Sequence, residues 1–301
     1  MSVQTFTSAA TVDEAVGAMA AGARPVAGGT DLVVGARQGK APLPESIVAI
    51  HAIGELRGIA VADGGLWIGA LATHEELAEH PVVRERFTAV ADAAAIVGSH
   101  ATRAQGTIGG NLMNASPAME TGGPLVCFGA SVTLHSARGS REVAVADLFA
   151  GPGQTTAKAD ELLTAVTVPA PAAGTGSCYL RLEYRRQMEI AVVGATAVVT
   201  LDGGKVTDAR IAITALAPTI HRVAEAEAAL VGTDGEREAA EVAAAAAAAG
   251  AAPISDVRAS AEYRRAMAAV IARRAIEAAH ARARGETVPI PASSALHGGA
   301  S

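Results

Sequence analysis

Two glycine-rich segments contain the residue types that bind phosphate. The first is Ala27–Leu32, with the sequence AGGTDL, and it follows a short segment with strand character. Consecutive glycines lack the Cβ atoms that would block a tight turn, so several backbone N–H groups can point at one anion. Thr30 adds a hydroxyl donor, and each N–H aimed at a charged phosphate oxygen is worth about 1.5–3 kcal/mol. Taken alone, this segment fits a phosphate site and a plain Gly-Gly turn equally well.

The second segment, Thr107–Asn111, repeats this chemistry with the sequence TIGGN: a hydroxyl, paired glycines, and an amide that can donate and accept hydrogen bonds. It lies in the stretch 98–123, which holds six glycines, shows neither helical nor strand periodicity, and is expected to be a structured loop. Because both phosphates of a diphosphate are charged, such a group needs donors from more than one side. Together the two segments predict a clamp for the phosphates of a dinucleotide. No G-x-G-x-x-G pattern joins a strand to a helix, so the site is not of the Rossmann type.

Charge and cysteine content exclude several other classes. The 301 residues carry 24 Lys and Arg against 30 Asp and Glu, a net charge of −6, whereas a nucleic-acid partner selects clustered positive charge. Cys127 and Cys178 form no C-x-x-C pattern, so they cannot supply the ligands of a zinc site or an iron–sulfur cluster. No apolar stretch of about 18 residues and no signal peptide is visible. We expect no nucleic-acid partner, no transmembrane segment and a cytoplasmic location.

Short strands mixed with helices predict an α+β fold in two parts. Thr11–Glu14 has the pattern of a capping box, and apolar residues follow it at helical spacing: Val12, Ala15, Val16 and Met19. Further helices are expected over 223–231, 236–249 and 260–284. The best linker candidate is 169–176, rich in proline, alanine and glycine. The predicted organisation is a first domain over 1–173 (subdomains of about 1–60 and 61–173), a second over 177–285, and a flexible tail over 286–301.

No set of side chains has the spacing of a catalytic or metal site. Five histidines are scattered along the chain without i,i+4 pairing, and surface or core roles fit them better than metal ligation: His51, His74, His80, His100 and His135. Of these, His100 could approach a ligand, because it stands just before the second glycine segment. No serine stands in an elbow motif or beside a paired base. We therefore expect no catalytic acid or base and no metal ligand in this chain.

Both glycine segments, at this separation, resemble the FAD-binding medium subunit of the molybdenum hydroxylases. The matching motifs are AGGTDL at 27–32 and TIGGNLMNASPAMET at 107–121. The family includes xanthine dehydrogenases, aerobic carbon monoxide dehydrogenases and N-heterocycle dehydrogenases. Similar residues also fall at 68–70, 161–163 and 179–181, so the resemblance covers roughly 1–285. It implies a FAD-binding domain of the vanillyl-alcohol-oxidase (PCMH) type over 1–173, followed by a smaller α+β C-terminal domain.

The resemblance also implies roles for individual residues. It places the diphosphate of FAD on Val26, Ala27, Gly28, Gly29, Thr30, Asp31 and Leu32, and on Thr107, Ile108, Gly109, Gly110 and Asn111. Val97 would line the flavin side, Leu163 would contact the flavin or its ribityl chain, and Glu120 would accept from a ribityl or ribose hydroxyl. Glu120 stands where the family usually has Asp, and Arg181 where it often has Lys, so these two contacts depart from the family pattern.

A multi-subunit complex follows from the resemblance. Substrate would be oxidised at a molybdopterin centre in a large partner subunit, and electrons would pass through two [2Fe-2S] clusters of a small partner to the FAD of this chain and on to an external acceptor. The expected assembly is a dimer of such heterotrimers. Two alternatives stay open: a stand-alone FAD-dependent oxidase of the same fold, and a flavin-free assembly subunit. Ile190 lies next to a position where carbon monoxide dehydrogenases often carry an aromatic, which favours a xanthine- or heterocycle-type relative.

Overall fold

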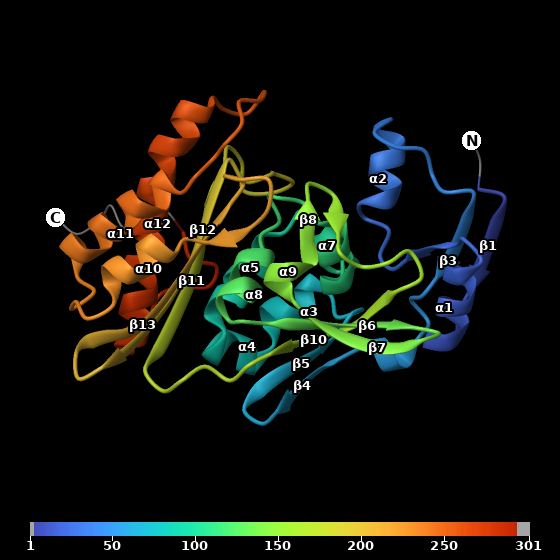
Figure 1. Ribbon diagram of the computed structural model, residues 1–301, viewed down its shortest axis with the longest axis horizontal. Helices are drawn as coiled ribbons and strands as arrows, with labels where there is room; N and C mark the ends of the chain where they lie inside the picture. The colour runs from blue at the N-terminus through green and yellow to red at the C-terminus, as the bar shows by residue number, and fades with distance from the viewer. Residues whose placement is uncertain (1–2, 294–301) are drawn as a thin grey trace.

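The computed structural model describes residues 3–293, and its N-terminal part is a small parallel sheet with two helices (Figure 1). The strand order is β1 (Thr5–Ser8), β3 (Ser46–Ala49), β2 (Arg24–Val26). α1 (Val12–Ala20) begins at Thr11, whose side chain accepts from the Glu14 amide. Its buried residues are the four that the periodicity predicts: Val12, Ala15, Val16 and Met19. α2 (Leu32–Arg37) follows β2, and the η1 turn (Gly54–Leu56) leads out of this part.

The middle part is built on a five-stranded antiparallel sheet. Its strands, in spatial order, are β4 (Ile59–Ala62), β5 (Gly65–Gly69), β10 (Leu162–Val168), β6 (Ser131–Ser136) and β7 (Gly139–Ala144). The helices of this part are α3 (His74–Glu79), α4 (Pro81–Arg86), α5 (Thr88–Ile96), α6 (His100–Arg103), α7 (Ile108–Asn114), α8 (Gly122–Cys127) and α9 (Val145–Leu148). A short pair, β8 (Phe149–Gly151) and β9 (Gln154–Thr155), completes it. Sheet and helices bury one continuous apolar core.

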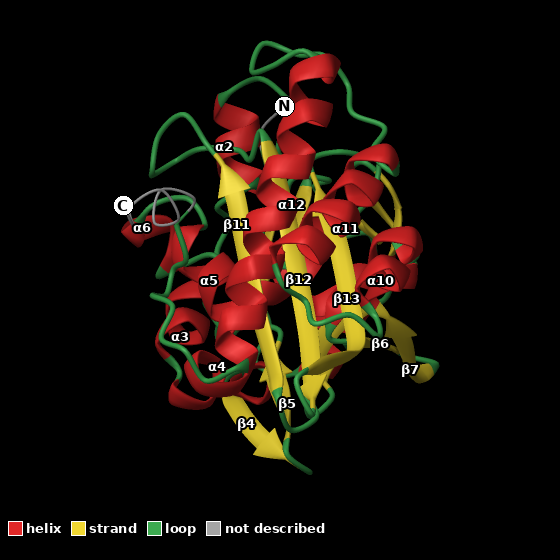
Figure 2. Cartoon of the chain, turned by 90° about the vertical axis from the view of Figure 1, so that its left-hand side faces the viewer, coloured by secondary structure: helices red, strands yellow, loops and turns green. Residues whose placement is uncertain are grey.

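The C-terminal part is a four-stranded antiparallel sheet with helices on one face. The strand order is β11 (Thr175–Leu182), β12 (Val193–Asp202), β13 (Lys205–Thr214), β14 (His221–Arg222). Figure 2 shows α11 (Arg237–Ala249) and α12 (Ala261–Ala283) lying in front of the long strands, beside α10 (Ala224–Leu230). All three predicted helices are confirmed. The buried face of α11 is made of alanines, which allow close packing on the sheet.

The second face of this sheet packs on the middle part. Side chains alternate along a strand, so Cys178 and Leu180 lie among the C-terminal helices, whereas Tyr179 and Val198 belong to the core of the middle part. α5 and α8 supply the helix surfaces that meet β11, β12 and β13. The two parts therefore share a core, and the division into domains 1–173 and 177–285, with its subdomain boundary near residue 60, stays a prediction.

The chain after α12 differs from the expected flexible tail over 286–301. The Ala292 amide donates to the Asp92 carboxylate at 2.9 Å, and the Arg282 guanidinium donates to the carbonyls of Val288 (3.3 Å) and Pro289 (2.8 Å). Residues 286–293 are thus held on the folded chain by the buried Asp92 carboxylate and by Arg282. No local sequence pattern predicts these contacts. The rest of the predicted tail, 294–301, lies outside the described residues.

Two structural absences hold for residues 3–293. No helix there is both long and apolar enough to cross a membrane; the 23-residue α12 carries arginines along its length. In the same range, no three His, Cys, Asp or Glu side chains gather as a metal site would require.

Candidate functional site

The first glycine segment lies directly against the chain that leads into the second. A Cβ on Gly28 would stand 1.9 Å from the Gln105 carbonyl oxygen and 3.2 Å from the Gly106 nitrogen, so only glycine fits there. Gly29 has a φ of +69°, which lets the chain turn from β2 into α2. The Thr30 hydroxyl oxygen lies 3.4 Å from the point where a Gly106 Cβ would be. The structure therefore brings the two predicted segments together.

The backbone N–H groups of the first segment are open. Two of its carbonyls accept hydrogen bonds: Gly29 accepts from the Val33 amide and Asp31 from the Gly35 amide. The amides of residues 28–32 have no hydrogen-bond acceptor within the part of the chain that the structure describes. These five N–H groups, beside the Thr30 hydroxyl, are a donor set without acceptors. Such a set binds anions.

The second segment differs from the expected loop with free amides. Thr107 is the N-cap of α7, and its hydroxyl accepts from the Gly110 amide at 3.1 Å. The amides of Ile108 and Gly109 donate to Ala72 (2.9 Å) and Ala70 (3.0 Å), and that of Asn111 donates to Thr107 (2.9 Å). These four amides are paired within the protein, and the prediction that the segment holds the phosphates stays a prediction. Gly109 also allows close packing, since a Cβ on it would lie 2.8 Å from the Ala70 carbonyl oxygen.

Asn111 and Thr121 are linked side chain to side chain. The Thr121 hydroxyl donates to the Asn111 Oδ1 at 2.6 Å, which leaves the Asn111 amide nitrogen as a donor. Gly110 is exposed and Asn111 is half-buried, so the start of α7 has little side-chain bulk at Gly110.

Glu120 and Arg181, predicted as separate cofactor contacts, bind each other. The side chain of Arg181 is 1% exposed and that of Glu120 is 9% exposed, and the Arg181 Nη1 donates to the Glu120 carboxylate. The Arg181 Nε also donates to Glu183 at 2.5 Å. Burial raises the pKa of Glu120 to about 7, although the Arg181 charge opposes this. One oxygen of the Glu120 carboxylate is thus engaged by Arg181, and its role as an acceptor for a ribityl or ribose hydroxyl stays a prediction.

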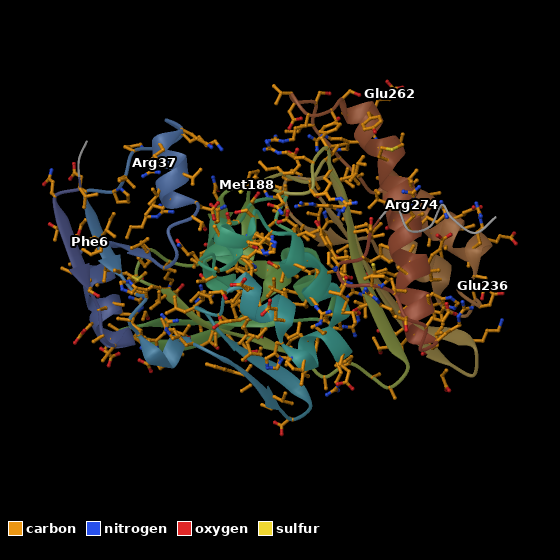
Figure 3. All side chains as sticks on the ribbon, turned by 180° about the vertical axis from the view of Figure 1, so that it is seen from behind. Phe6, Arg37, Met188, Glu236, Glu262 and Arg274 are labelled. Carbon is orange, nitrogen blue, oxygen red and sulfur yellow. The ribbon has the colours of Figure 1, made fainter. Side chains whose placement is uncertain are left out.

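The remaining predicted residues, Val97 and Leu163, lie at different depths. Val97 is half-buried at the end of α5, and its carbonyl accepts from the Arg103 Nη1 at 3.1 Å. Leu163 is 3% exposed and its side chain belongs to the main core, so it could meet a ligand only through its main chain. Next to Val97, the Gly98 carbonyl accepts from the Met188 amide at 2.9 Å. Figure 3 shows Met188 and Arg37, which ends α2, along the same edge of the molecule.

His74 and Gly106 are residues of the site that the sequence did not single out. The Gly106 carbonyl accepts from the His74 amide at 3.0 Å, and Thr73 pairs with Thr107 across an antiparallel bridge. The His74 side chain is 2% exposed and packs beneath Gly106. A histidine directly after a capping threonine is common enough in a helix start that its type and position gave no signal.

A cavity of about 360 Å³ lies elsewhere, between α1 and the five-stranded sheet. It is lined by Thr11, Asp13, Glu55, Trp67 and His135 among others, and none of the predicted site residues reaches it. The close approach of Gly28 to Gln105 and Gly106, which we call the glycine crossing, is the better candidate site. It has unpaired N–H donors beside it, whereas the cavity has none of the predicted contacts.

Two sequence families match the chain in succession. Residues 2–171 match the family described as "FAD binding domain in molybdopterin dehydrogenase", and residues 179–279 match "CO dehydrogenase flavoprotein C-terminal domain".

Individual relatives agree with these families. The chain is 36% identical to the carbon monoxide dehydrogenase medium chain of Afipia carboxidovorans over 87% of this chain and 90% of that one. It is 31% identical to a putative xanthine dehydrogenase FAD-binding subunit of Escherichia coli over 92% and 96%. A solved structure of reconstituted CO dehydrogenase from Oligotropha carboxidovorans superposes with a TM-score of 0.88 at 34% identity, covering 92% of this chain and 98% of that chain. These identities give no support to the xanthine-type preference drawn from Ile190.

Proposed function

The chain belongs to the family of FAD-binding subunits of the molybdopterin dehydrogenases, and from this premise we propose that it holds one FAD with the diphosphate on the amides of residues 28–32. The single observation that carries the placement is the row of five N–H groups without acceptors beside the Thr30 hydroxyl. Donors of this kind, fixed before the ligand arrives, bind a charged oxygen without reorganisation. The residues present therefore fit the cofactor.

The other predicted contacts take the roles that their geometry permits. Gly28 lets the first segment approach Gln105 and Gly106, and we propose the side-chain amide nitrogen of Asn111 as a further donor to the cofactor. We propose Val97 and the main chain at Leu163 as the flavin side of the site. Arg181 is proposed to hold Glu120 in place rather than to contact the cofactor. When bound, FAD accepts electrons and passes them on, while this chain supplies binding and orientation.

As a medium subunit, the chain is one component of a multi-subunit oxidoreductase. We propose that its partners are a large molybdopterin-binding subunit and a small subunit with two [2Fe-2S] clusters, assembled as a dimer of heterotrimers in the cytoplasm. Electrons from the small subunit would reach an external acceptor through this chain.

The test compares two glycine variants of the full chain. Gly28→Ala puts a Cβ 1.9 Å from the Gln105 oxygen, whereas Gly35→Ala, on the next helix, meets nothing within 4 Å. We expect the wild type and Gly35→Ala to bind FAD, measured by the flavin absorption bands after desalting, and Gly28→Ala to lose it. Equal flavin content in all three proteins would overturn the placement. Failure of the wild type to bind FAD would leave the flavin-free assembly subunit, and substrate oxidation by the chain alone would favour the stand-alone oxidase.

A further inference from the structure

A buried imidazole lies directly under the crossing of the two glycine segments. A Cβ on Gly106 would lie 3.3 Å from the His74 Cδ2 and 3.4 Å from the Thr30 hydroxyl oxygen, so the ring edge and the hydroxyl face the same point. In an imidazole, Cδ2 is bonded to Nε2. The Cδ2–Nε2 edge of His74 therefore borders Gly106, the same backbone position that the Thr30 hydroxyl borders.

The hydrogen bonding around His74 indicates which ring nitrogen carries the proton. Nδ1 is fully buried and has no hydrogen-bond partner within residues 3–293. A proton on Nδ1 would thus be an unpaired buried donor, which is costly, whereas a bare Nδ1 leaves only an unused lone pair. Burial first, and the nearby charge of Arg103 second, lower the pKa of His74 to about 4, so the ring is neutral at physiological pH. The favoured form is the neutral tautomer with its proton on Nε2.

Charged groups around the ring do not change this picture. Arg103 is the charged group that lowers the pKa of His74. Its Nη1 donates to the Val97 carbonyl, and its Nη2 lies 3.1 Å from the His100 Nδ1. The first segment faces the ring with the Thr30 hydroxyl, and the second faces it with the backbone of Gly106. No carboxylate within the described residues forms a hydrogen bond or ion pair with His74, so nothing in the protein competes for its Nε2 proton.

We propose that His74 is a further diphosphate-binding residue, a neutral imidazole whose Nε2–H donates to the cofactor phosphate from beneath the glycine crossing. This inference rests on the proposed function, because it needs the diphosphate to lie over residues 28–32. Its chemical consequence is specific. His74 should recognise the phosphates and not the flavin ring.

The test uses side chains that copy one ring nitrogen at a time. Glutamine can place its amide nitrogen near the position of Nε2, whereas asparagine reaches only the position of Nδ1. We expect His74→Asn and His74→Phe to weaken FAD binding to the full FAD-free chain by about 10- to 100-fold, the effect of losing one hydrogen bond to a charged group. His74→Gln should retain most of the affinity. Affinities are measured by titration calorimetry, with a thermal melt of each apo-protein as the folding check.

Two controls make the result specific. Riboflavin lacks phosphate, so its binding, measured at whatever concentration it requires, should be unaffected by all three variants. His80→Gln alters the residue at the other end of α3, whose Nδ1 is also buried without a partner, and should leave FAD binding unchanged. Equal FAD affinity for wild type, His74→Asn and His74→Phe would overturn the proposal, as would a parallel loss of riboflavin binding. A wild type that binds no FAD would instead refute the proposed function.

Discussion

The same buried imidazole makes a prediction about the FAD-free protein: the stability of the chain should fall between pH 6.5 and pH 4 because of His74. The ordinary pKa of histidine is 6.5, and in the folded chain burial and the charge of Arg103 lower it to about 4. In that window the unfolded chain takes up a proton at His74 and the folded chain does not. Protonation therefore pulls toward the unfolded state as the pH falls, and the stability present above pH 6.5 is lost progressively.

The size of the effect follows from the two pKa values. A difference of about 2.5 between them corresponds to about 3 kcal/mol in the free energy of unfolding, reached below pH 4. The side chain is 2% exposed, so solvent screening reduces this little. A loss of this size is a large fraction of the 5–15 kcal/mol that is typical of a folded domain.

The contribution of His74 to the pH dependence of stability is measured by urea unfolding of wild type and His74→Gln, at half-unit steps from pH 4.5 to pH 7.5. Glutamine does not titrate, so the variant should lack this contribution and the difference between the two curves should change with pH below 6.5 and be flat above. His80→Gln, at the other end of α3, is the matched control for the substitution itself. Parallel curves for wild type and His74→Gln over the whole range would show that His74 titrates normally in the folded chain, and the tautomer argument would fail with it.

Two further predictions concern ion pairs. Asp92 is 0% exposed and accepts from Arg282 at 2.6 and 3.0 Å and from the amides of Tyr179 and Ala292. Asp92→Ala should therefore lower the free energy of unfolding by about 3–5 kcal/mol, whereas Asp160→Ala, which removes an exposed ion pair, should lower it by at most about 1 kcal/mol. Equal losses for the two variants in urea melts would contradict this. Hydrogen bonds from Arg141 lower the pKa of Glu161 to about 2, so its contribution to stability is present above pH 4.5 and lost as the pH falls toward 2. Glu161→Gln should flatten the acid side of the stability curve, and an unchanged slope would count against the pair.

Local patterns predicted the fold where a helix or strand carries its own signal. α1 has a capping threonine and four apolar residues at helical spacing, and the structure buries those same four. α10, α11 and α12 also lie where they were expected, because alanine-rich segments of this length are helical whatever they pack on. Signals of this kind are contained within about a dozen residues.

The stretch 98–123 was predicted as a structured loop, and half of it is helical. α6, α7 and the start of α8 lie in it, each only four to seven residues long. Helices this short have no period that a sequence window can detect, and they are stabilised by contacts from elsewhere, such as the bonds from Ile108 and Gly109 to Ala72 and Ala70. The TIGGN sequence reads equally as an anion loop or as a threonine-capped helix start, and only the partners of its amides decide between the two.

The site itself was half visible from the sequence. The first segment could be found because a second glycine pair beside a hydroxyl residue occurs in the same chain, at 107–111. The pairing of Glu120 with Arg181 could not, because 61 residues separate the two and neither has a local partner pattern. His74 was assigned a core or surface role on the same grounds, since what distinguishes it is a neighbour, Gly106, that approaches only in the folded chain.

The two buried ion pairs that the sequence did not predict also bear on which part of the chain is needed to bind a cofactor. Glu120 and Asp92 lie in the first predicted domain, and their arginines, Arg181 and Arg282, lie in the second. A fragment ending at residue 173 would therefore keep two buried carboxylates and lose both counter-charges, together with the face of β11 that covers α5 and α8. The glycine crossing is positioned by α3, α6 and α7, which belong to the same part as those carboxylates. We therefore expect the proposed binding of a dinucleotide at residues 28–32 to require the whole chain, because the C-terminal sheet neutralises and buries the part that supports the site.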